Sequence, residues 1–156
     1  MNRRTTELLA LFALLGATLA VGFVASLATV PNIPGWYAGL HKPSFNPPNG
    51  IFAPVWTALY VLMAIAAWRV WRKAGLRPLR LYAVQLILNG AWSFIFFGAH
   101  AVGAALAEIV LLLALVLAVT ASFWGKDRIA GLLFLPYAAW VLFALVLNAA
   151  IWRLNG

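Results

Sequence analysis

Residues 103–124 read GAALAEIVLLLALVLAVTASFW and contain one charged side chain, that of Glu108. A helix of this length and composition can cross the roughly 30 Å hydrocarbon core of a bilayer. Four other apolar stretches are of similar length. The sequence therefore predicts five transmembrane helices, at about residues 5–30, 51–71, 79–97, 103–124 and 129–152.

The composition agrees with this interpretation. Of the 156 residues 65% are hydrophobic and only 9% are charged, too few to cover the surface of a soluble domain. No linker is long enough to separate a second domain. We expect an all-α integral membrane protein, a five-helix bundle formed by a single domain over residues 1–156. Cysteine is absent from the sequence, which excludes disulfides and thiolate chemistry.

The first stretch has two interpretations. Arg3 and Arg4 followed by an apolar run and Ser26-Leu27-Ala28 resemble a signal peptide with its cleavage site. The run from Leu8 to Ala25 is longer than a usual signal core, and four more spans follow. We favour a retained helix.

The basic residues predict the orientation. Nine lie on one side of the membrane in this arrangement and two, Lys42 and Arg153, on the other. The positive-inside rule then places the N-terminus in the cytoplasm and the C-terminus and the loop 31–50 outside. Helical spans favour a bacterial inner membrane over an outer one. The basic residues gather at span ends, so the net charge of +8 does not indicate nucleic-acid binding.

The eight tryptophans fall into two groups. Trp68, Trp71, Trp124 and Trp152 end predicted helices, where indoles typically anchor at the headgroup level. The others lie in the external loop or inside spans, where a buried indole N–H needs a partner. They are Trp36, Trp56, Trp92 and Trp140.

Polar and aromatic residues share helix faces. In the third span they recur every three or four residues, as Tyr82, Gln85, Asn89, Trp92 and Phe96. Amides in hydrocarbon need partners, so this face should point into the bundle, either joining helices or contacting a ligand. The fifth span adds Tyr137, Trp140, Ala144 and Asn148, and the second adds Trp56, Tyr60 and Met63. Pro136 in the fifth span predicts a kink or a wider groove. The depths of these polar and aromatic residues converge in the outer half, as suits a mostly apolar ligand.

The external loop is rich in proline and aromatic residues. It has five prolines from Pro31 to Pro48, and it carries Trp36, Tyr37 and Phe45. We expect a lid over the outer mouth of the bundle; the alternative is a loop lying in the headgroup layer. His41 and Lys42 are candidates for contacting ligand carboxylates. Glu108 either contacts the ligand or lid, or caps its own helix.

No enzyme signature is visible. The histidines His41 and His100 lie in or beside external loops, and no cluster of residues has metal-ligand spacing. We therefore expect neither a metal nor a required cofactor.

Several of these motifs resemble the TspO/MBR family of tryptophan-rich sensory and translocator proteins, and the resemblance covers nearly the whole chain. The motifs are Trp36-Tyr37, Lys42-Pro43-Ser44-Phe45-Asn46-Pro47-Pro48, Trp56-Thr57-Ala58-Leu59-Tyr60, Tyr82 with Gln85-Leu86, Asn89 and Trp92, Phe96-Phe97-Gly98, Pro136-Tyr137-Ala138-Ala139-Trp140, Leu147-Asn148 and Trp152-Arg153.

The resemblance implies a five-helix bundle, often a homodimer, that binds porphyrins such as protoporphyrin IX, benzodiazepine-type drugs and, in some members, sterols. The pocket it implies is lined by Trp36, Tyr37, Pro47, Pro48, Trp56, Gln85, Asn89, Tyr137, Trp140 and Ala144. Trp56 and Trp140 resemble a pair tied to light-dependent porphyrin breakdown. Phe45 replaces a Trp of many relatives. No Tyr lies between Leu147 and Arg153, so the resemblance does not extend to the sterol motif.

Three functions follow as hypotheses. The first is a porphyrin-binding sensor, carrier or scavenger in tetrapyrrole homeostasis or stress response. The second is light-dependent oxidative degradation of the bound porphyrin, with Trp56 and Trp140 as the candidate catalytic residues. The third and least favoured is a small proton-coupled exporter, for which Glu108 is the one candidate coupling residue. Small residues at spacing four, Gly16/Ala20, Gly22/Ser26 and Gly103/Ala107, permit a homodimer.

Overall fold

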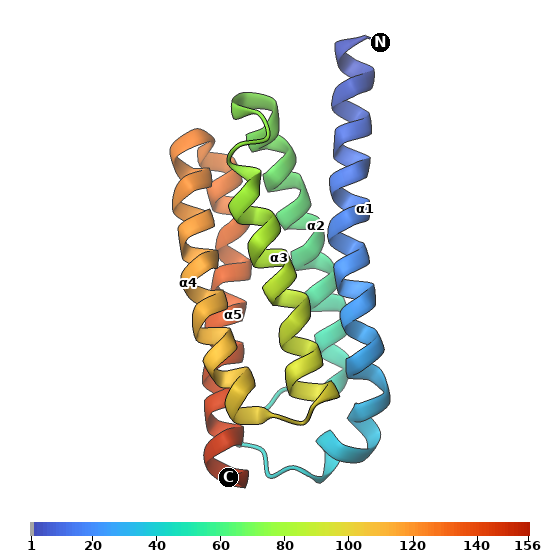
Figure 1. Ribbon diagram of the computed structural model, residues 1–156, viewed down its shortest axis with the longest axis vertical. Helices are drawn as coiled ribbons and strands as arrows, with labels where there is room; N and C mark the ends of the chain where they lie inside the picture. Colours follow the sequence, from blue (N-terminus) through green and yellow to red (C-terminus); the bar gives the residue numbers. More distant parts are fainter. Residues whose placement is uncertain (1) are drawn as a thin grey trace.

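The computed structural model describes residues 2–156, and within that range the secondary structure is helical (Figure 1). Five helices are long and apolar enough to cross a membrane, as predicted. Their bounds are α1 Arg3–Thr29, α2 Asn49–Ala74, α3 Leu79–Ser93, α4 Val102–Lys126 and α5 Arg128–Asn155. A π-helical turn, η3 (Phe94–Gly98), extends α3.

Local sequence explains several helix ends. Asn2 caps α1 by accepting a hydrogen bond from the N–H of Arg4, and Asp127 caps α5 by accepting one from the N–H of Ala130, both at 3.1 Å. These side chains satisfy N–H groups that a helix start leaves without partners. Gly75 ends α2 at a φ of 70°, a conformation that disfavours other residues.

The prediction of a loop over residues 31–50 is wrong for its first part, residues 31–39, which are helical. Helical turns η1 (Val30–Asn32) and η2 (Ile33–Tyr37) continue from α1, and only residues 40–48 are without helix. Pro31 and Pro34 fall in the first turn of these short segments, where the missing N–H of proline costs no helical hydrogen bond. The prolines therefore start helical turns here instead of ending them.

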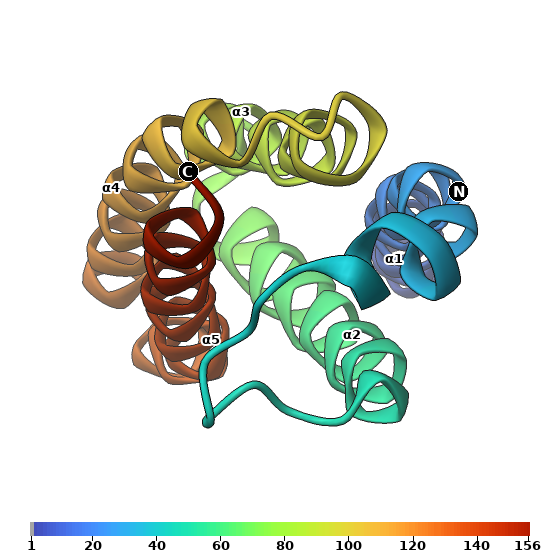
Figure 2. The ribbon, with the colours of Figure 1, turned by 90° about the horizontal axis from the view of Figure 1, so that it is seen from below.

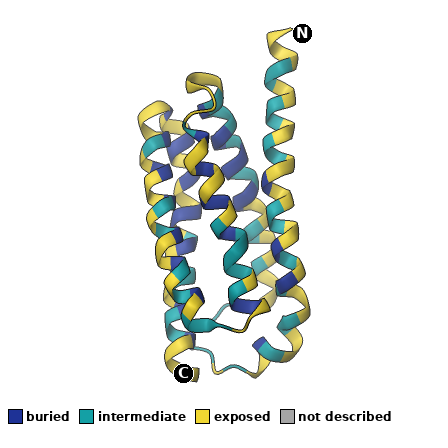
Figure 3. Cartoon of the chain, viewed as in Figure 1, coloured by how far each residue is buried: buried dark blue, intermediate teal, exposed yellow. Residues whose placement is uncertain are grey.

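The bundle packs unevenly. Seen from one end, α2 to α5 surround a common interior and α1 lies at the side (Figure 2). Only Thr18, Ala25 and Ala28 of α1 are buried, and its first turns project beyond the ends of the other helices (Figure 1). Large apolar side chains such as Phe12 and Ile87 are about two-thirds exposed, as expected of surfaces that face lipid (Figure 3).

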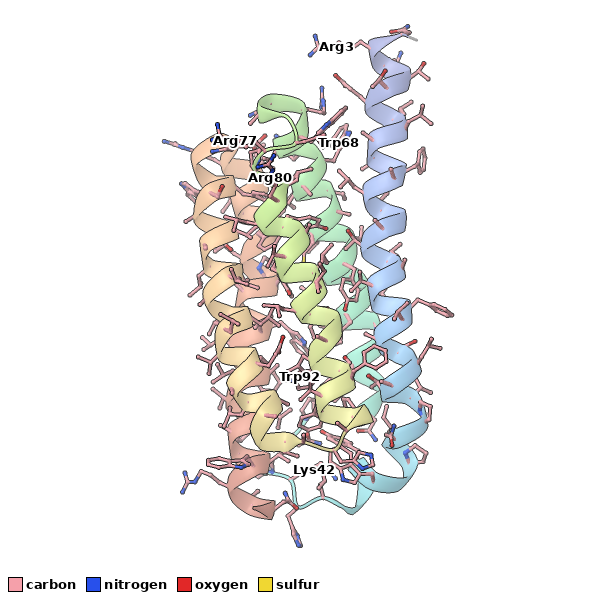
Figure 4. All side chains as sticks on the ribbon, in the orientation of Figure 1. Arg3, Lys42, Trp68, Arg77, Arg80 and Trp92 are labelled. Atoms are coloured by element: carbon pink, nitrogen blue, oxygen red, sulfur yellow. The ribbon has the colours of Figure 1, made fainter. Side chains whose placement is uncertain are left out.

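The two ends of the bundle differ in charge. One end, here called the basic end, carries the α1 N-terminus, the turn between α2 and α3 and the turn between α4 and α5; Arg3, Arg77 and Arg80 lie there (Figure 4). The other, the loop end, carries residues 40–48 with Lys42 and the C-terminus. This separation matches the predicted asymmetry of basic residues along the chain.

The predicted interface tryptophans have different surroundings. Trp124 and Trp152 are 44% and 48% exposed, as an anchor should be. Trp68 instead donates its indole N–H to the backbone oxygen of Glu7, at 2.8 Å, and so ties α2 to α1. Trp71 packs against the buried core.

Candidate functional site

A cavity of about 440 Å³ lies in the half of the bundle toward the loop end. Side chains from all five helices line it, and aromatic rings form much of its wall. Eight of the thirteen residues predicted to bind ligand are in the lining: Tyr37, Trp56, Tyr60, Asn89, Trp92, Trp140, Ala144 and Asn148.

A chain of buried hydrogen bonds crosses one wall of the cavity. Tyr60 donates its hydroxyl to Oδ1 of Asn89 at 2.6 Å, and Nδ2 of Asn89 donates to the hydroxyl oxygen of Tyr137 at 3.0 Å. That hydroxyl donates to Oε1 of Gln85 at 2.8 Å, and Nε2 of Gln85 points to the sulfur of Met63 at 4.0 Å. Each amide and hydroxyl thus finds a partner, which removes the cost of burying it.

The chain has an inner and an outer part. Tyr60 and Asn89 reach the cavity, whereas Gln85 and Tyr137 are fully buried and do not line it. Gln85 and Tyr137 therefore influence the cavity indirectly, because their hydrogen bonds hold the Asn89 amide in one orientation. The sequence predicted that the face of Gln85 and Asn89 points into the bundle, and their burial confirms it.

Trp92 is fixed by a second polar contact. Its indole N–H donates to Oδ1 of Asn148 at 3.1 Å, and Nδ2 of Asn148 donates to the backbone oxygen of Val102 at 3.0 Å. The ring also stacks on Phe96 with centroids 4.9 Å apart. Three elements, α3, α4 and α5, are joined at this corner of the cavity.

Trp56 and Trp140 differ from Trp92 because their donors are unused. Trp56 stacks on Tyr60 with centroids 5.5 Å apart, and Trp140 meets Phe52 edge to face at 6.1 Å. Among residues 2–156, neither indole N–H has a hydrogen-bond acceptor, and neither nitrogen is among the buried polar atoms that lack one. Both rings line the cavity and can donate to a ligand within it.

Trp36, Pro47 and Pro48 do not line the cavity. Trp36 stacks on the ring of His100, with centroids 4.3 Å apart and planes 11° from parallel. His100 has a positive φ of 54° and its ring lies 3.0 Å from Oδ1 of Asn32. Trp36 therefore braces the connection between α3 and α4 instead of contacting the cavity.

His41 and Lys42 are engaged with the backbone. The ammonium of Lys42 donates to the carbonyl oxygens of Tyr37 at 2.6 Å and Leu40 at 3.0 Å, and it lies 4.8 Å from the centre of the Tyr37 ring. A ligand carboxylate would compete with these carbonyls. The backbone of His41 exchanges two hydrogen bonds with the amide of Asn155, at 2.9 and 2.8 Å.

Glu108 lies near the start of α4 and does not line the cavity. Both of its carboxylate oxygens are buried and have no hydrogen-bond partner among residues 2–156. Glu108 is thus not among the residues that line the cavity, although its neighbour Ile109 is.

The sequence pattern of the TspO/MBR family matches residues 14–153. This chain belongs to the TspO/MBR family. It is 41% identical over 152 residues to the Tryptophan-rich protein TspO of Archaeoglobus fulgidus, covering 96% of this chain and 99% of that one. It is 39% identical over 140 residues to the Translocator protein of Sus scrofa, covering 86% and 83%. It is 41% identical over 121 residues to the Tryptophan-rich sensory protein of Cereibacter sphaeroides, covering 77% of each chain. With its five long apolar helices, this TspO/MBR protein is a multi-pass membrane protein.

The sequence missed the part of the cavity that α1 supplies. Leu19, Gly22, Phe23 and Ser26 line it, together with Phe52 and Phe143. Gly22 and Ser26 were interpreted only as small residues that permit helix contacts. Gly22 does serve close packing, but within the chain: a Cβ there would lie 2.8 Å from Cδ2 of Tyr60. The glycine at position 22 was the one feature of the sequence that could have indicated this close contact.

The residues of this TspO/MBR protein offer stacking and hydrogen bonding to a guest. Among residues 2–156, no group of three His, Asp or Glu side chains is placed to hold a metal ion. Rings from Trp56, Tyr60, Trp92 and Trp140 surround a mostly apolar space, and amide groups supply directional contacts. The arrangement suits binding of a flat apolar molecule.

Proposed function

We propose that this protein binds a porphyrin, or a similar flat hydrophobic molecule, in the cavity between its helices, and that it acts as a sensor, carrier or scavenger of tetrapyrroles. The observation that carries the proposal is the pair Trp56 and Trp140, which line the cavity with both indole N–H groups unbonded within residues 2–156. The names of the relatives, translocator and tryptophan-rich sensory protein, fit carrying and sensing.

The size and chemistry of the cavity support this ligand class. Its volume of about 440 Å³ is within the range of roughly 300–1,000 Å³ typical of small-molecule sites. Aromatic rings add about 0.5–1.5 kcal/mol per stacked pair beyond burial. A macrocycle with an apolar face and ring nitrogens matches indole faces, unbonded N–H donors and the Tyr60–Asn89 pair.

Residues 40–48 form the lid in this proposal. They pass the C-terminal end of α5 before entering α2 (Figure 2), held there by the contacts of His41 with Asn155. With the basic end in the cytoplasm, the cavity and its lid face the outside of a bacterial inner membrane. The ligand then enters from the outer side.

Titration of protoporphyrin IX into purified protein, followed by quenching of tryptophan fluorescence, tests the proposal. The double variant Trp56→Phe/Trp140→Phe should bind at least about tenfold more weakly, because both indole N–H donors are lost and both rings become smaller. Trp152→Phe, outside the cavity, is the matched control and should bind as wild type does. Unsaturable quenching, or equal affinity in the double variant, would reject porphyrin binding at this site.

A second candidate function is light-dependent oxidation of the bound porphyrin by dioxygen. Trp56 favours it, because its ring contacts both Tyr60 and Tyr137, at 5.5 and 6.2 Å, and these phenols belong to the buried hydrogen-bond chain. Neighbouring redox-active rings can share an oxidising equivalent. Product analysis of illuminated samples in air and under argon tests it. Products that form equally in the dark, or in the Trp56→Phe/Trp140→Phe variant, would reject it.

A further inference from the structure

A hollow of about 470 Å³ lies at the basic end, far from the ligand cavity. The C-terminal turns of α2 and α4 and the first turn of α5 surround it. Four basic side chains and one acidic side chain line it, which leaves it three positive charges in excess: Arg69, Lys73, Lys126, Arg128 and Asp127.

The acidic side chain, Asp127, already forms ion pairs with two of these basic side chains. Asp127 is 3% exposed, and its Oδ2 lies 3.0 Å from Nη2 of Arg69 and 2.9 Å from Nζ of Lys73. Its Oδ1 accepts the backbone N–H of Ala130. The carboxylate therefore pairs with two of the four cations that line the hollow.

The remaining cations have no counter-charge in the chain. Lys126 and Arg128 are exposed and form no ion pair among residues 2–156. The sequence has three acidic residues in all. Glu7 pairs with Arg3 and Arg72, and Glu108 lies at the opposite end of α4. In addition, the buried Nε of Arg69 has no hydrogen-bond acceptor among the described residues. The site therefore has positive charge available to bind an anion from outside the chain.

The border of the hollow is apolar and faces lipid. Trp124 and Ile129 line its edge and are 44% and 51% exposed. Arg128, Leu132 and Leu135 follow at helical spacing on α5, and these two leucines are also exposed. A molecule held by Lys126 and Arg128 thus has hydrocarbon surface directly beside its charged group.

We propose that this hollow binds an anionic phospholipid, with the headgroup phosphate on Lys126 and Arg128 and the acyl chains along Ile129, Leu132 and Leu135. Basic pockets between transmembrane helices are suited to such headgroups, and each basic residue near the surface attracts anionic lipid. Bound there, the lipid joins the ends of α2, α4 and α5. This site is independent of the proposed porphyrin cavity.

Native mass spectrometry of delipidated protein in detergent, titrated with phosphatidylglycerol or phosphatidylcholine, tests the proposal. Wild type should prefer phosphatidylglycerol, and Lys126→Gln/Arg128→Gln should bind it about tenfold more weakly. Arg77→Gln/Arg80→Gln is the matched control, because it removes the same charge from the same end outside the hollow (Figure 4). Its affinity should stay within about twofold of wild type.

Two further arms separate the alternatives. Lys126→Arg/Arg128→Lys keeps both charges and should keep the preference, while helix content by circular dichroism shows that each variant is folded. Equal losses in the two glutamine variants would mean a diffuse basic surface and overturn the site. Inorganic phosphate that raises the thermal denaturation midpoint as much as phosphatidylglycerol does, at equal concentration, would mean a free-anion site and overturn the lipid assignment.

Discussion

Asn89 and Tyr137 are joined by a 3.0 Å hydrogen bond from the amide nitrogen of Asn89 to the phenol oxygen of Tyr137. The bond links α3 to α5, and its two residues differ in position: Asn89 lines the cavity and Tyr137 does not. The same phenol donates onward to Gln85. A fully buried side chain thus sets the direction of the amide that faces the cavity.

Replacing the phenol of Tyr137 should cost more stability than replacing the phenol of Tyr60, which begins the series of buried hydrogen bonds. Tyr137→Phe leaves both Oε1 of Gln85 and Nδ2 of Asn89 without partners, whereas Tyr60→Phe leaves only Oδ1 of Asn89. An unsatisfied buried group costs about 1–3 kcal/mol. In detergent, the thermal denaturation midpoint should be highest for wild type, lower for Tyr60→Phe and lowest for Tyr137→Phe. Equal midpoints for the two variants would contradict the proposed linkage.

Gly22 should be intolerant of a side chain, unlike Gly16 on the same helix. A Cβ on Gly22 meets the Tyr60 ring, whereas a Cβ on Gly16 has no neighbour within 4 Å. Gly22→Ala displaces Tyr60, an overpacking that typically costs about 1–3 kcal/mol. Gly16→Ala should be neutral or stabilise by up to about 1 kcal/mol, through helix propensity. Denaturation midpoints of the two variants measure the difference, and a stabilised Gly22→Ala protein would refute the contact.

The face of α3 could be predicted because spacing and polarity coincide there. Buried amides at Gln85 and Asn89 need partners in hydrocarbon, so their side of the helix had to face other helices. The lining contributed by α1 could not be predicted in the same way. Leu19 and Phe23 face the cavity and Phe12 does not, yet all are apolar in a uniformly apolar helix, and lipid and cavity select the same residue types.

Long-range contacts explain the other differences. Asn155 bonds to His41 across 114 residues, and no local pattern marks either residue as a partner. Trp36 was expected to line the pocket because the family resemblance implied it, and it lies in the aromatic, proline-rich segment that was expected to form a lid. The helical turns from Val30 to Tyr37 instead direct its ring onto His100. Pro31 and Pro34 lie in the first turns of these helical segments, so their effect on the path of the chain was local and was not visible as a loop pattern.

Asn155 should hold residues 40–48 against the bundle, and the side chain of His41 should not be needed for it. Both hydrogen bonds use the backbone of His41, so His41→Ala preserves them and Asn155→Ala removes them. With about 0.5 kcal/mol for each bond, amide hydrogen exchange in this segment should rise about fivefold in Asn155→Ala. Mass spectrometry measures the exchange. A similar rise in His41→Ala, or none in Asn155→Ala, would contradict this role.

Asp127 should make the protein sensitive to acid. Burial raises the pKa of its carboxyl, but hydrogen bonds from Lys73, the Ala130 N–H and Arg69 outweigh burial and lower the pKa from 3.8 to about 2. Because the folded protein favours the ionised carboxylate, the stabilisation is complete above the unfolded pKa near 4 and is lost as the pH falls toward 2. Its full size is about 2 kcal/mol at neutral pH.

Asp127→Asn separates this effect from every other acidic group. Asparagine is also a good N-cap and can still accept the Ala130 N–H, so α5 keeps its start while the ion pairs with Arg69 and Lys73 are lost. We expect the thermal denaturation midpoint of wild type to exceed that of the variant at neutral pH. The gap should close between about pH 4 and pH 2, where the carboxyl of wild type takes up its proton. Glu7 and Glu108 are present in both proteins, so their contributions cancel from the comparison. A gap that stays constant down to about pH 2 would show that the charge of Asp127 does not stabilise the fold.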